Sequence, residues 1–165
     1  MGRSVMQISV VVKDIQKTME KYVDLWRVEP WEIHIFNPST VKEFIVNGKL
    51  ISDFEFLLAV SWVGDVQIEL IQPVKGPNIY KDFLDQNGEG VHHLKEYVED
   101  SEIPKMLKEY EEKGIGVIQS GRYDNDVFYY LDTKAALGFL LEIGNNGKVR
   151  EPVRWYPSKG INKNV

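Results

Sequence analysis

The 165-residue sequence contains no cysteine, no long hydrophobic run and no excess of basic residues. The absence of cysteine excludes disulfide bonds, thiolate metal ligands and cysteine nucleophiles, so any metal must be bound by oxygen or imidazole nitrogen. No apolar stretch approaches the roughly 20 residues that span a bilayer, and we therefore expect no membrane partner and a cytoplasmic protein. The net charge of -5 argues against nucleic acid as a partner, because no basic surplus is available to neutralise phosphates.

A short phrase occurs twice in the chain, as QISVVVKD over residues 7–14 and HLKEYVED over residues 93–100. Each copy begins with a side chain that can bind a metal, continues as a strand, and ends at an aspartate suited to start a helix. Later in each half an apolar strand contains one carboxylate, Glu69 or Glu142. A glutamate buried in such a strand is costly unless its charge is compensated. The pattern predicts a duplicated module with a divalent metal where the two copies meet.

The order of predicted elements also repeats. In the first half, apolar periodicity predicts a helix after Asp14 and strands over residues 5–13, 31–36, 41–46, 54–62 and 66–72. In the second half it predicts a helix over 102–113 and strands over 91–98, 116–119, 127–131 and 139–143. A linker helix over 79–87 separates the halves. The chain therefore reads as one α+β domain, residues 1–146, made of two βαβββ modules (about 5–73 and 91–144), followed by a polar C-terminal tail over 147–165.

Side chains alternate across a strand, which puts the polar residues of each module on one face. If each module bends into an open half-barrel, Gln7, Glu69, His93 and Glu142 meet in a cleft. Two carboxylates would neutralise a divalent cation such as Zn, Co, Ni, Mn or Mg. The alternative for Glu69 is a solvated position on a one-sided sheet, although the matching Glu142 favours the ligand interpretation. His34, between two isoleucines, is expected to be a strand histidine rather than a ligand.

Lys95 lies two residues beyond His93 and should point into the same cleft. It could bind a carboxylate or phosphate of the substrate as a counter-charge, and it would reduce the crowding of negative charge near the metal ligands. The alternative is an exposed lysine on the strand.

Four segments carry a resemblance to a known family: QISVVVKD (7–14), IELIQP (68–73), GEGVHHL (88–94) and LEI (141–143). Over roughly residues 5 to 144 the chain resembles the vicinal oxygen chelate superfamily, also called glyoxalase/bleomycin resistance/dioxygenase, and most of all its methylmalonyl-CoA epimerase and lactoylglutathione-lyase-like branches. The resemblance implies that His93, Glu69 and Glu142 are metal ligands. It also shows a departure, because the first ligand position usually holds histidine and here holds Gln7, a weaker donor. The epimerases have a second, unligated glutamate, which would fall near Asp53 or Glu55.

The resulting hypothesis is a metal-dependent isomerase or lyase that removes a proton next to a carbonyl or thioester. Glu142 is the expected base, with Asp53 or Glu55 as a second acid, and the substrate would be an acyl-CoA or a thiol adduct acted on by a homodimer. An extradiol dioxygenase fits less well, since that chemistry favours two histidines and one carboxylate. The competing hypothesis is a non-catalytic protein of the same fold that binds or sequesters a small molecule.

Overall fold

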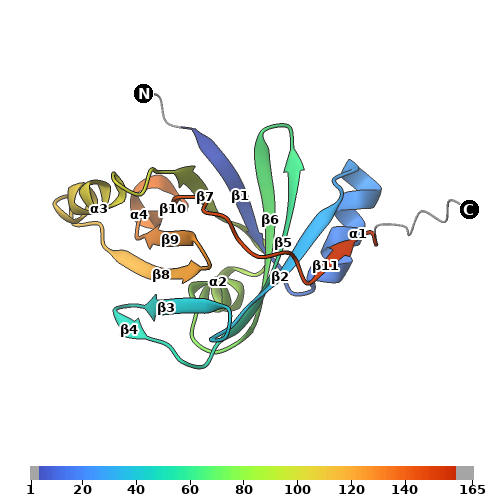
Figure 1. Ribbon diagram of the computed structural model, residues 1–165, viewed down its shortest axis with the longest axis horizontal. Helices are drawn as coiled ribbons and strands as arrows, with labels where there is room; N and C mark the ends of the chain where they lie inside the picture. The colour runs from blue at the N-terminus through green and yellow to red at the C-terminus, as the bar shows by residue number, and fades with distance from the viewer. Residues whose placement is uncertain (1–3, 159–165) are drawn as a thin grey trace, which may run out of the picture.

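Two halves of similar strand order pair edge to edge in the computed structural model, which describes residues 4–158 (Figure 1). The strands are β1 (Val5–Val11), β2 (Trp31–Phe36), β3 (Val41–Val46), β4 (Lys49–Leu50), β5 (Glu55–Val63), β6 (Val66–Lys75), β7 (Gly90–Tyr97), β8 (Val117–Tyr123), β9 (Asp126–Leu131), β10 (Leu140–Gly144) and β11 (Arg154–Tyr156). The helices are α1 (Ile15–Trp26), α2 (Ile79–Asn87), α3 (Ile103–Glu111) and α4 (Lys134–Leu137). None of these helices is long and apolar enough to cross a membrane.

The sheet has the order β11-β2-β5-β6-β1-β7-β10-β9-β8-β3-β4. Its first half contains β2-β5-β6-β1 and its second half the matching series β8-β9-β10-β7, joined by antiparallel pairing of β1 with β7. Within each half the first and last strands are parallel neighbours, β1 with β6 and β7 with β10. The predicted α+β fold of two duplicated modules is therefore confirmed, and the sheet stays open rather than closing into a barrel.

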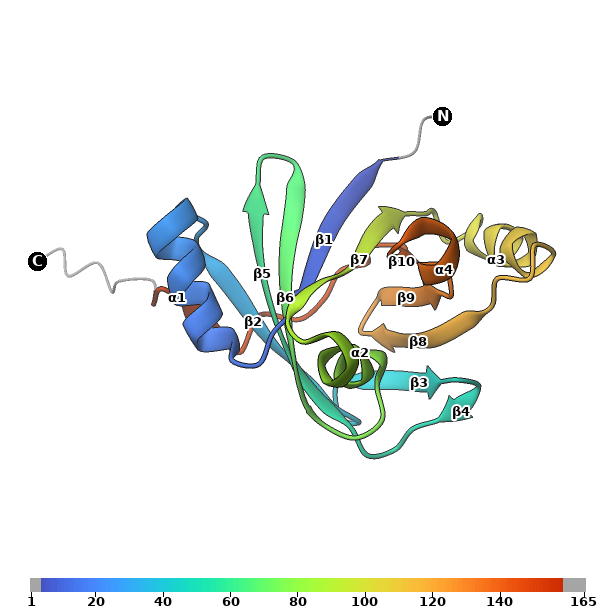
Figure 2. The same cartoon turned by 180° about the vertical axis from the view of Figure 1, so that it is seen from behind.

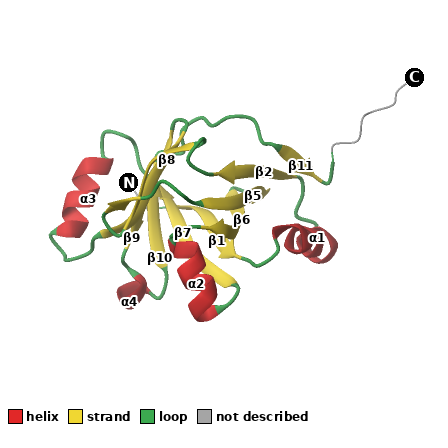
Figure 3. Ribbon diagram, turned by 90° about the horizontal axis from the view of Figure 1, so that it is seen from below, coloured by secondary structure: helices red, strands yellow, loops and turns green. Residues whose placement is uncertain are grey.

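The alternation of side chains along β1 explains how the sheet has two different faces. Gln7, Ser9 and Val11 are buried on the inner face, whereas Ile8 and Val10 pack against the hydrophobic cluster under α1. The helix α1 begins after Asp14, whose side chain accepts a hydrogen bond from the Lys17 backbone N–H at 3.0 Å. Viewed from below, the helices lie on the outer side of the curved sheet, and the inner side is formed by the strands (Figure 3).

The helix α2 lies near the junction of the two halves, against β6, β1 and β7 (Figure 2). Its N-cap, Asn78, accepts a hydrogen bond from the Lys81 backbone N–H at 2.8 Å, and its first turn buries Ile79 and Tyr80 in the central core. The predicted linker helix therefore packs where the two halves of the sheet meet. Its tyrosine reaches the inner face of the sheet, where the polar residues of both modules lie.

The hairpin of β3 and β4 belongs to the first half in sequence but joins the sheet at the edge of the second half. After β2 the chain turns through Asn37 and Thr40, whose side chains bond to nearby backbone and side-chain groups, and β3 then pairs with β8 of the other half. The sequence predicts the strand at residues 41–46 but not this partner. Strands so far apart in sequence pair according to which strand edges are free in the assembled sheet. Local periodicity contains no information about those edges.

The chain after β10 crosses the open side of the sheet before it forms β11 on the edge of β2 (Figure 1). We call residues 145–153 the strap. Arg150 in the strap makes a two-point ion pair with Asp124, with Nη2–Oδ1 and Nε–Oδ2 distances of 2.6 and 3.0 Å. Val153 donates its backbone N–H to the Ile33 carbonyl at 2.8 Å. The predicted C-terminal tail thus contains an anchored strap and a strand, and its residues 159–165 lie outside the described part.

Gly147 tests whether the strap needs its close contact with the second half. A Cβ atom on Gly147 would lie 1.9 Å from the Asn125 carbonyl oxygen, which is backbone and cannot rotate away. We expect Gly147→Ala to lower the free energy of unfolding by about 1–3 kcal/mol, as overpacking of a close contact does. Thermal or urea denaturation measures the change.

The matched control is Gly116→Ala, since a Cβ there meets nothing within 4 Å. It should stay within about 0.5 kcal/mol of wild type, as surface substitutions usually do. Equal stability of the two variants would show that the strap is not held against the loop at Asn125.

Candidate active site

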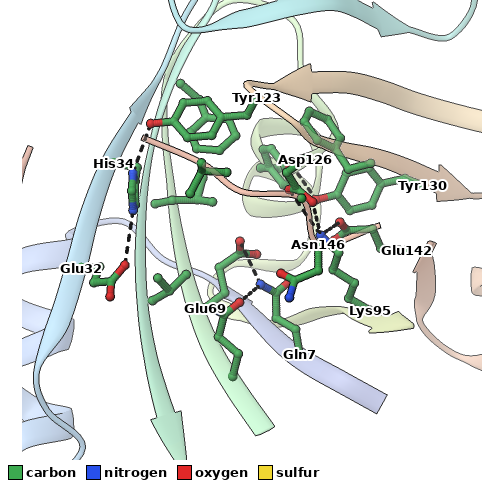
Figure 4. Close-up of a pocket in the computed structure, with 18 residues that line it drawn as sticks. Gln7, Glu32, His34, Glu69, Lys95, Tyr123, Asp126, Tyr130, Glu142 and Asn146 are labelled. Carbon is green, nitrogen blue, oxygen red and sulfur yellow. Dashed lines mark hydrogen bonds and ion pairs between the residues drawn. The ribbon is translucent and has the colours of Figure 1, made fainter. Parts of the chain in front are cut away.

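The inner face of the sheet and the strap enclose a cavity of about 120 Å³ (Figure 4). One part of its lining is polar and combines Gln7, Gln67, Glu69, Lys95 and Glu142. The rest is largely aromatic and aliphatic and includes Phe36, Tyr123, Phe128, Tyr130 and Leu58. A small apolar cavity with a few converging charged groups is the usual form of a binding or catalytic site.

The predicted ligand residues come together from both halves. His93, which is fully buried, places Nε2 2.9 Å from Glu142 Oε2 and 3.4 Å from Glu69 Oε2. Gln7 Nε2 donates to Gln67 Oε1 and lies 3.4 Å from Glu69 Oε1. The structure thus places Gln7, Glu69, His93 and Glu142 in one buried network, in which Gln7 contacts Glu69 and His93 contacts both glutamates.

Lys95 is the buried counter-charge of this group rather than an exposed lysine. Its Nζ lies 3.1 Å from Glu142 Oε1 and 3.4 Å from Asp126 Oδ1, and its side chain is 5% exposed. Burial lowers the pKa of Lys95, but Glu142 and Asp126 raise it more, so the ammonium stays charged. Burial likewise raises the pKa of Glu142, while Lys95 and His93 lower it more, and Glu142 is an ionised carboxylate.

His92 lies against the other ring nitrogen of His93. The two Nδ1 atoms are 2.8 Å apart, so one must donate and the other accept. Burial lowers the pKa of His92 far below its usual value and keeps it neutral. If His93 Nδ1–H is the donor, Nε2 of a neutral His93 presents a lone pair to the carboxylates; if His92 is the donor, His93 Nε2 carries a proton.

Because Nε2 of His93 faces two carboxylates, it must either carry a proton or lie beside a cation. A proton is one solution: burial lowers the pKa of His93, and the nearby Glu142 and Glu69 raise it more, with a net upward shift. A divalent cation is the other, and three buried atoms with no hydrogen-bond partner suit it, namely Gln7 Oε1, Glu69 Oε2 and His93 Nε2.

The donor atoms of this site fit a divalent metal in their chemistry, but the side chains do not stand around a common point. Within residues 4–158 no three His, Asp or Glu side chains have an arrangement that would hold a metal ion. The physical reason is the short contact between His93 Nε2 and Glu142 Oε2, which fills the space where the donors meet. A bound ion would have to separate this pair.

Asp53 and Glu55 do not reach the cavity. The Asp53 side chain is 77% exposed and pairs with Lys75 at 2.6 Å, and Glu55 begins β5 outside the lining. The resemblance could not place the second acid because the segment between β2 and β5 contains the β3–β4 hairpin, which shifts the chain away from the site. The structure therefore gives neither residue a contact with the other predicted groups.

Several lining residues escaped the sequence analysis. Asp126 follows the same alternation as Phe128 and Tyr130 on β9, and this pattern could have assigned it to the inner face. Its pairing with Lys95 depends on tertiary structure and had no local signal. The same holds for Asn146 in the strap, which lines the cavity from outside both modules.

Comparisons with known proteins concern the family and the fold of the chain. The profile described as Glyoxalase/Bleomycin resistance protein/Dioxygenase superfamily matches residues 6–130. A hypothetical protein from Bacillus halodurans C-125 has a similar structure, with a TM-score of 0.68, 20% identity, and coverage of 92% of this chain and 99% of that one. A search of curated proteins finds no significant match.

Methylmalonyl-CoA epimerases are also among the similar structures. The Mycobacterium tuberculosis enzyme gives a TM-score of 0.64 at 20% identity, with 87% of this chain and 88% of that chain covered. A Streptomyces coelicolor epimerase variant in complex with 2-nitronate-propionyl-CoA gives 0.66 at 20% identity, with 90% and 98% covered. At this identity the likeness establishes the fold, and the chemistry must be argued from the residues of this chain.

The buried ion pairs of Lys95 predict a large stability effect. Lys95→Met leaves the Glu142 and Asp126 charges uncompensated in the interior, and we expect a loss of about 3–5 kcal/mol in the free energy of unfolding. Lys75→Met is the matched control, because its pair with Asp53 is exposed and should contribute less than about 1 kcal/mol. Urea denaturation measures both.

Adding Glu142→Gln to Lys95→Met should recover part of the lost free energy of unfolding, since it removes one of the two uncompensated buried charges. If Lys95→Met is no more destabilising than Lys75→Met, the lysine does not compensate buried carboxylates.

Proposed function

Because this chain belongs to the glyoxalase/bleomycin resistance protein/dioxygenase superfamily, we propose that it is a metal-dependent isomerase or lyase that abstracts a proton next to a carbonyl or thioester. The observation that carries the proposal is the buried cluster of Glu69, His93 and Glu142, whose two carboxylates line the cavity and which includes atoms without a hydrogen-bond partner. Buried charges without a structural need for them are costly, so such a group indicates a functional site.

The metal would be held by Gln7, Glu69, His93 and Glu142. The 2.8 Å contact between the Nδ1 atoms of His92 and His93 supports this assignment, because a metal on Nε2 requires His93 to donate its Nδ1–H, and His92 can accept it. When bound, a divalent ion such as Zn, Co, Ni, Mn or Mg supplies Lewis acidity that makes a C–H beside a carbonyl more acidic.

Glu142 is the residue that we propose accepts the proton. Lys95 holds its Oε1 at 3.1 Å, which keeps the carboxylate ionised and fixes its orientation in the cavity. Asp126 in turn holds Lys95 from the other side, at 3.4 Å. This placement leaves Lys95 as a positioning group for Glu142, while its expected role as a counter-charge for a substrate anion would require Asp126 to give up its contact.

The substrate class that fits this chemistry is a compound with an acidic C–H beside a thioester or ketone. An acyl-CoA is the first candidate, supported by the fold that the chain shares with an epimerase in complex with 2-nitronate-propionyl-CoA. A thiol adduct of an α-ketoaldehyde is the second. The aromatic wall formed by Phe36, Phe128 and Tyr130 would exclude water from the reacting carbon.

Gln7 favours a second candidate function, which is ligand binding without chemistry. A neutral amide oxygen is a weaker ligand than imidazole for most first-row metals. Protonated His93 can satisfy the two carboxylates without any metal, as the contacts of its Nε2 atom allow. A non-catalytic protein of this fold would then use the same cavity to hold a small molecule.

Metal binding distinguishes the two functions. We expect about one divalent ion per chain, because two carboxylates, an imidazole and an amide form a single donor set. His93→Ala and Glu142→Ala should abolish binding, Gln7→Ala should weaken it less, and Gln7→His should raise the affinity since imidazole is the stronger donor. Isothermal titration with Zn²⁺, Co²⁺ and Ni²⁺ measures these effects.

Asp85→Asn is the control for the titrations, because Asp85 is a surface carboxylate paired with Lys81 on α2. It should bind metal as wild type does. Equal occupancy in wild type and the His93 and Glu142 variants would contradict the ligand assignment, and an unchanged affinity of Gln7→His would show that residue 7 does not face the metal.

Proton exchange tests the chemistry itself. Methylmalonyl-CoA, or else the hemithioacetal of methylglyoxal with a thiol, should exchange its acidic C–H with D2O in the presence of the metal-loaded protein. Glu142→Gln keeps a ligand oxygen but removes the base, so exchange should fall by roughly 10²–10⁴-fold. Metal content should fall far less. Mass spectrometry follows the exchange.

Asp85→Asn again serves as the control and should exchange at the wild-type rate. If neither compound exchanges while a small molecule still binds in the cavity, the binding function replaces the enzymatic one. If only the hemithioacetal reacts, the protein is a lyase rather than an epimerase.

A further inference from the structure

A second chain of polar groups lines the same cavity and takes no part in holding Glu142. It consists of Tyr123 on β8 and His34 and Glu32 on β2. In Figure 4 Glu32 and His34 lie on one side of the cavity, whereas Lys95, Asp126 and Glu142 lie on the other. None of the three residues contacts the proposed metal ligands in the figure or through a described hydrogen bond.

The three side chains follow one another along the cavity wall from the buried Tyr123 to the partly exposed Glu32. His34 Nδ1 lies 3.1 Å from the Tyr123 hydroxyl, and its Nε2 lies 3.8 Å from Glu32 Oε2. The His34 side chain is 6% exposed and that of Glu32 is 38% exposed, so burial decreases from His34 to Glu32. Tyr123 is fixed by stacking on Phe36, with ring centroids 4.2 Å apart.

Burial keeps His34 and Tyr123 neutral, and the surrounding charges only partly oppose it. Burial lowers the pKa of His34 and Glu32 opposes the shift, while Arg150 and Asp124 act on it with opposite signs. Burial raises the pKa of Tyr123, and the Arg150 guanidinium over its ring partly offsets this. A neutral imidazole between a hydroxyl and a carboxylate can donate through one nitrogen and accept through the other.

Inversion at a carbon requires a proton to arrive on the face opposite to the one from which it left. Building on the proposed function, we propose that Tyr123, His34 and Glu32 form the relay that delivers this proton to the substrate, opposite Glu142. Tyr123 gives its O–H proton to the carbanion carbon, and His34 gives the proton on Nδ1 to the resulting phenolate. His34 then takes a proton on Nε2 from solvent water at Glu32, and Glu142 releases the abstracted proton to solvent, where it neutralises the hydroxide. His34 returns to its starting tautomer by proton exchange with water, so that the protein ends the cycle with the protons it began with.

The relay predicts that exchange and inversion can be separated. One epimer of methylmalonyl-CoA is incubated with metal-loaded protein in D2O, and deuterium uptake and loss of optical purity are followed together. Wild type should show both. Tyr123→Phe keeps the ring but lacks the donor, so inversion should fall roughly 10²–10⁴-fold while exchange at Glu142 stays within about threefold of wild type, less than the tenfold that 1.4 kcal/mol represents.

His34→Gln is the sharper variant, because its amide can still hydrogen-bond to Tyr123 but cannot pass a proton from one atom to another. It should show the same separation. Tyr129→Phe is the matched control, since Tyr129 neighbours the cavity strand residues but packs in the cluster under α3. It should retain both exchange and inversion.

The outcomes distinguish the relay from the proposed function. Exchange and inversion that both persist in Tyr123→Phe and His34→Gln, or that fall together in both variants, would overturn the relay alone. No exchange by wild type on either compound would overturn the proposed function and the relay with it.

Discussion

The antiparallel pairing of β1 with β7 is the contact on which the site depends, because it joins two modules that each carry half of the polar groups. Ser9 on β1 lies opposite His93 on β7 in this ladder. Parallel pairing in each half then sets Glu69 beside Ser9 and Glu142 beside Lys95. Side chains alternate along β6 and β10, so a slip of one residue in the β1–β6 or β7–β10 ladder would move Glu69 or Glu142 to the helix side.

Burial of so many charges is the energetic consequence of this pairing. Glu69, Glu142 and Asp126 share one region of the interior with a single ammonium group, that of Lys95. Three carboxylates and one lysine leave two negative charges, which one divalent cation would neutralise and one proton on His93 would only halve. This charge count is the physical argument behind the proposed metal site.

The sequence is informative about this fold wherever its periodicity is local. The strand around Gln7 and the helix after Asp14 follow from alternation and capping, and the repetition of this pattern around His93 reveals the duplication. Asp126 and Tyr123 were missed because each acquires its role from a partner on another strand, Lys95 or His34. The strap was interpreted as a tail, since its polar composition does not show that Arg150 and Val153 have fixed partners in the sheet.

The two halves are not equivalent at the site, and this difference separates the roles of the two glutamates. Gln7 and His93 occupy matching positions, as do Glu69 and Glu142, but the residue that matches Lys95 is Ser9, whose buried hydroxyl has no hydrogen-bond partner. Glu142 is therefore held by an ammonium group and Glu69 is not. The duplicated pair of carboxylates thus has two different environments, and a buried ammonium group fixes the orientation of Glu142, the one that we propose accepts the proton.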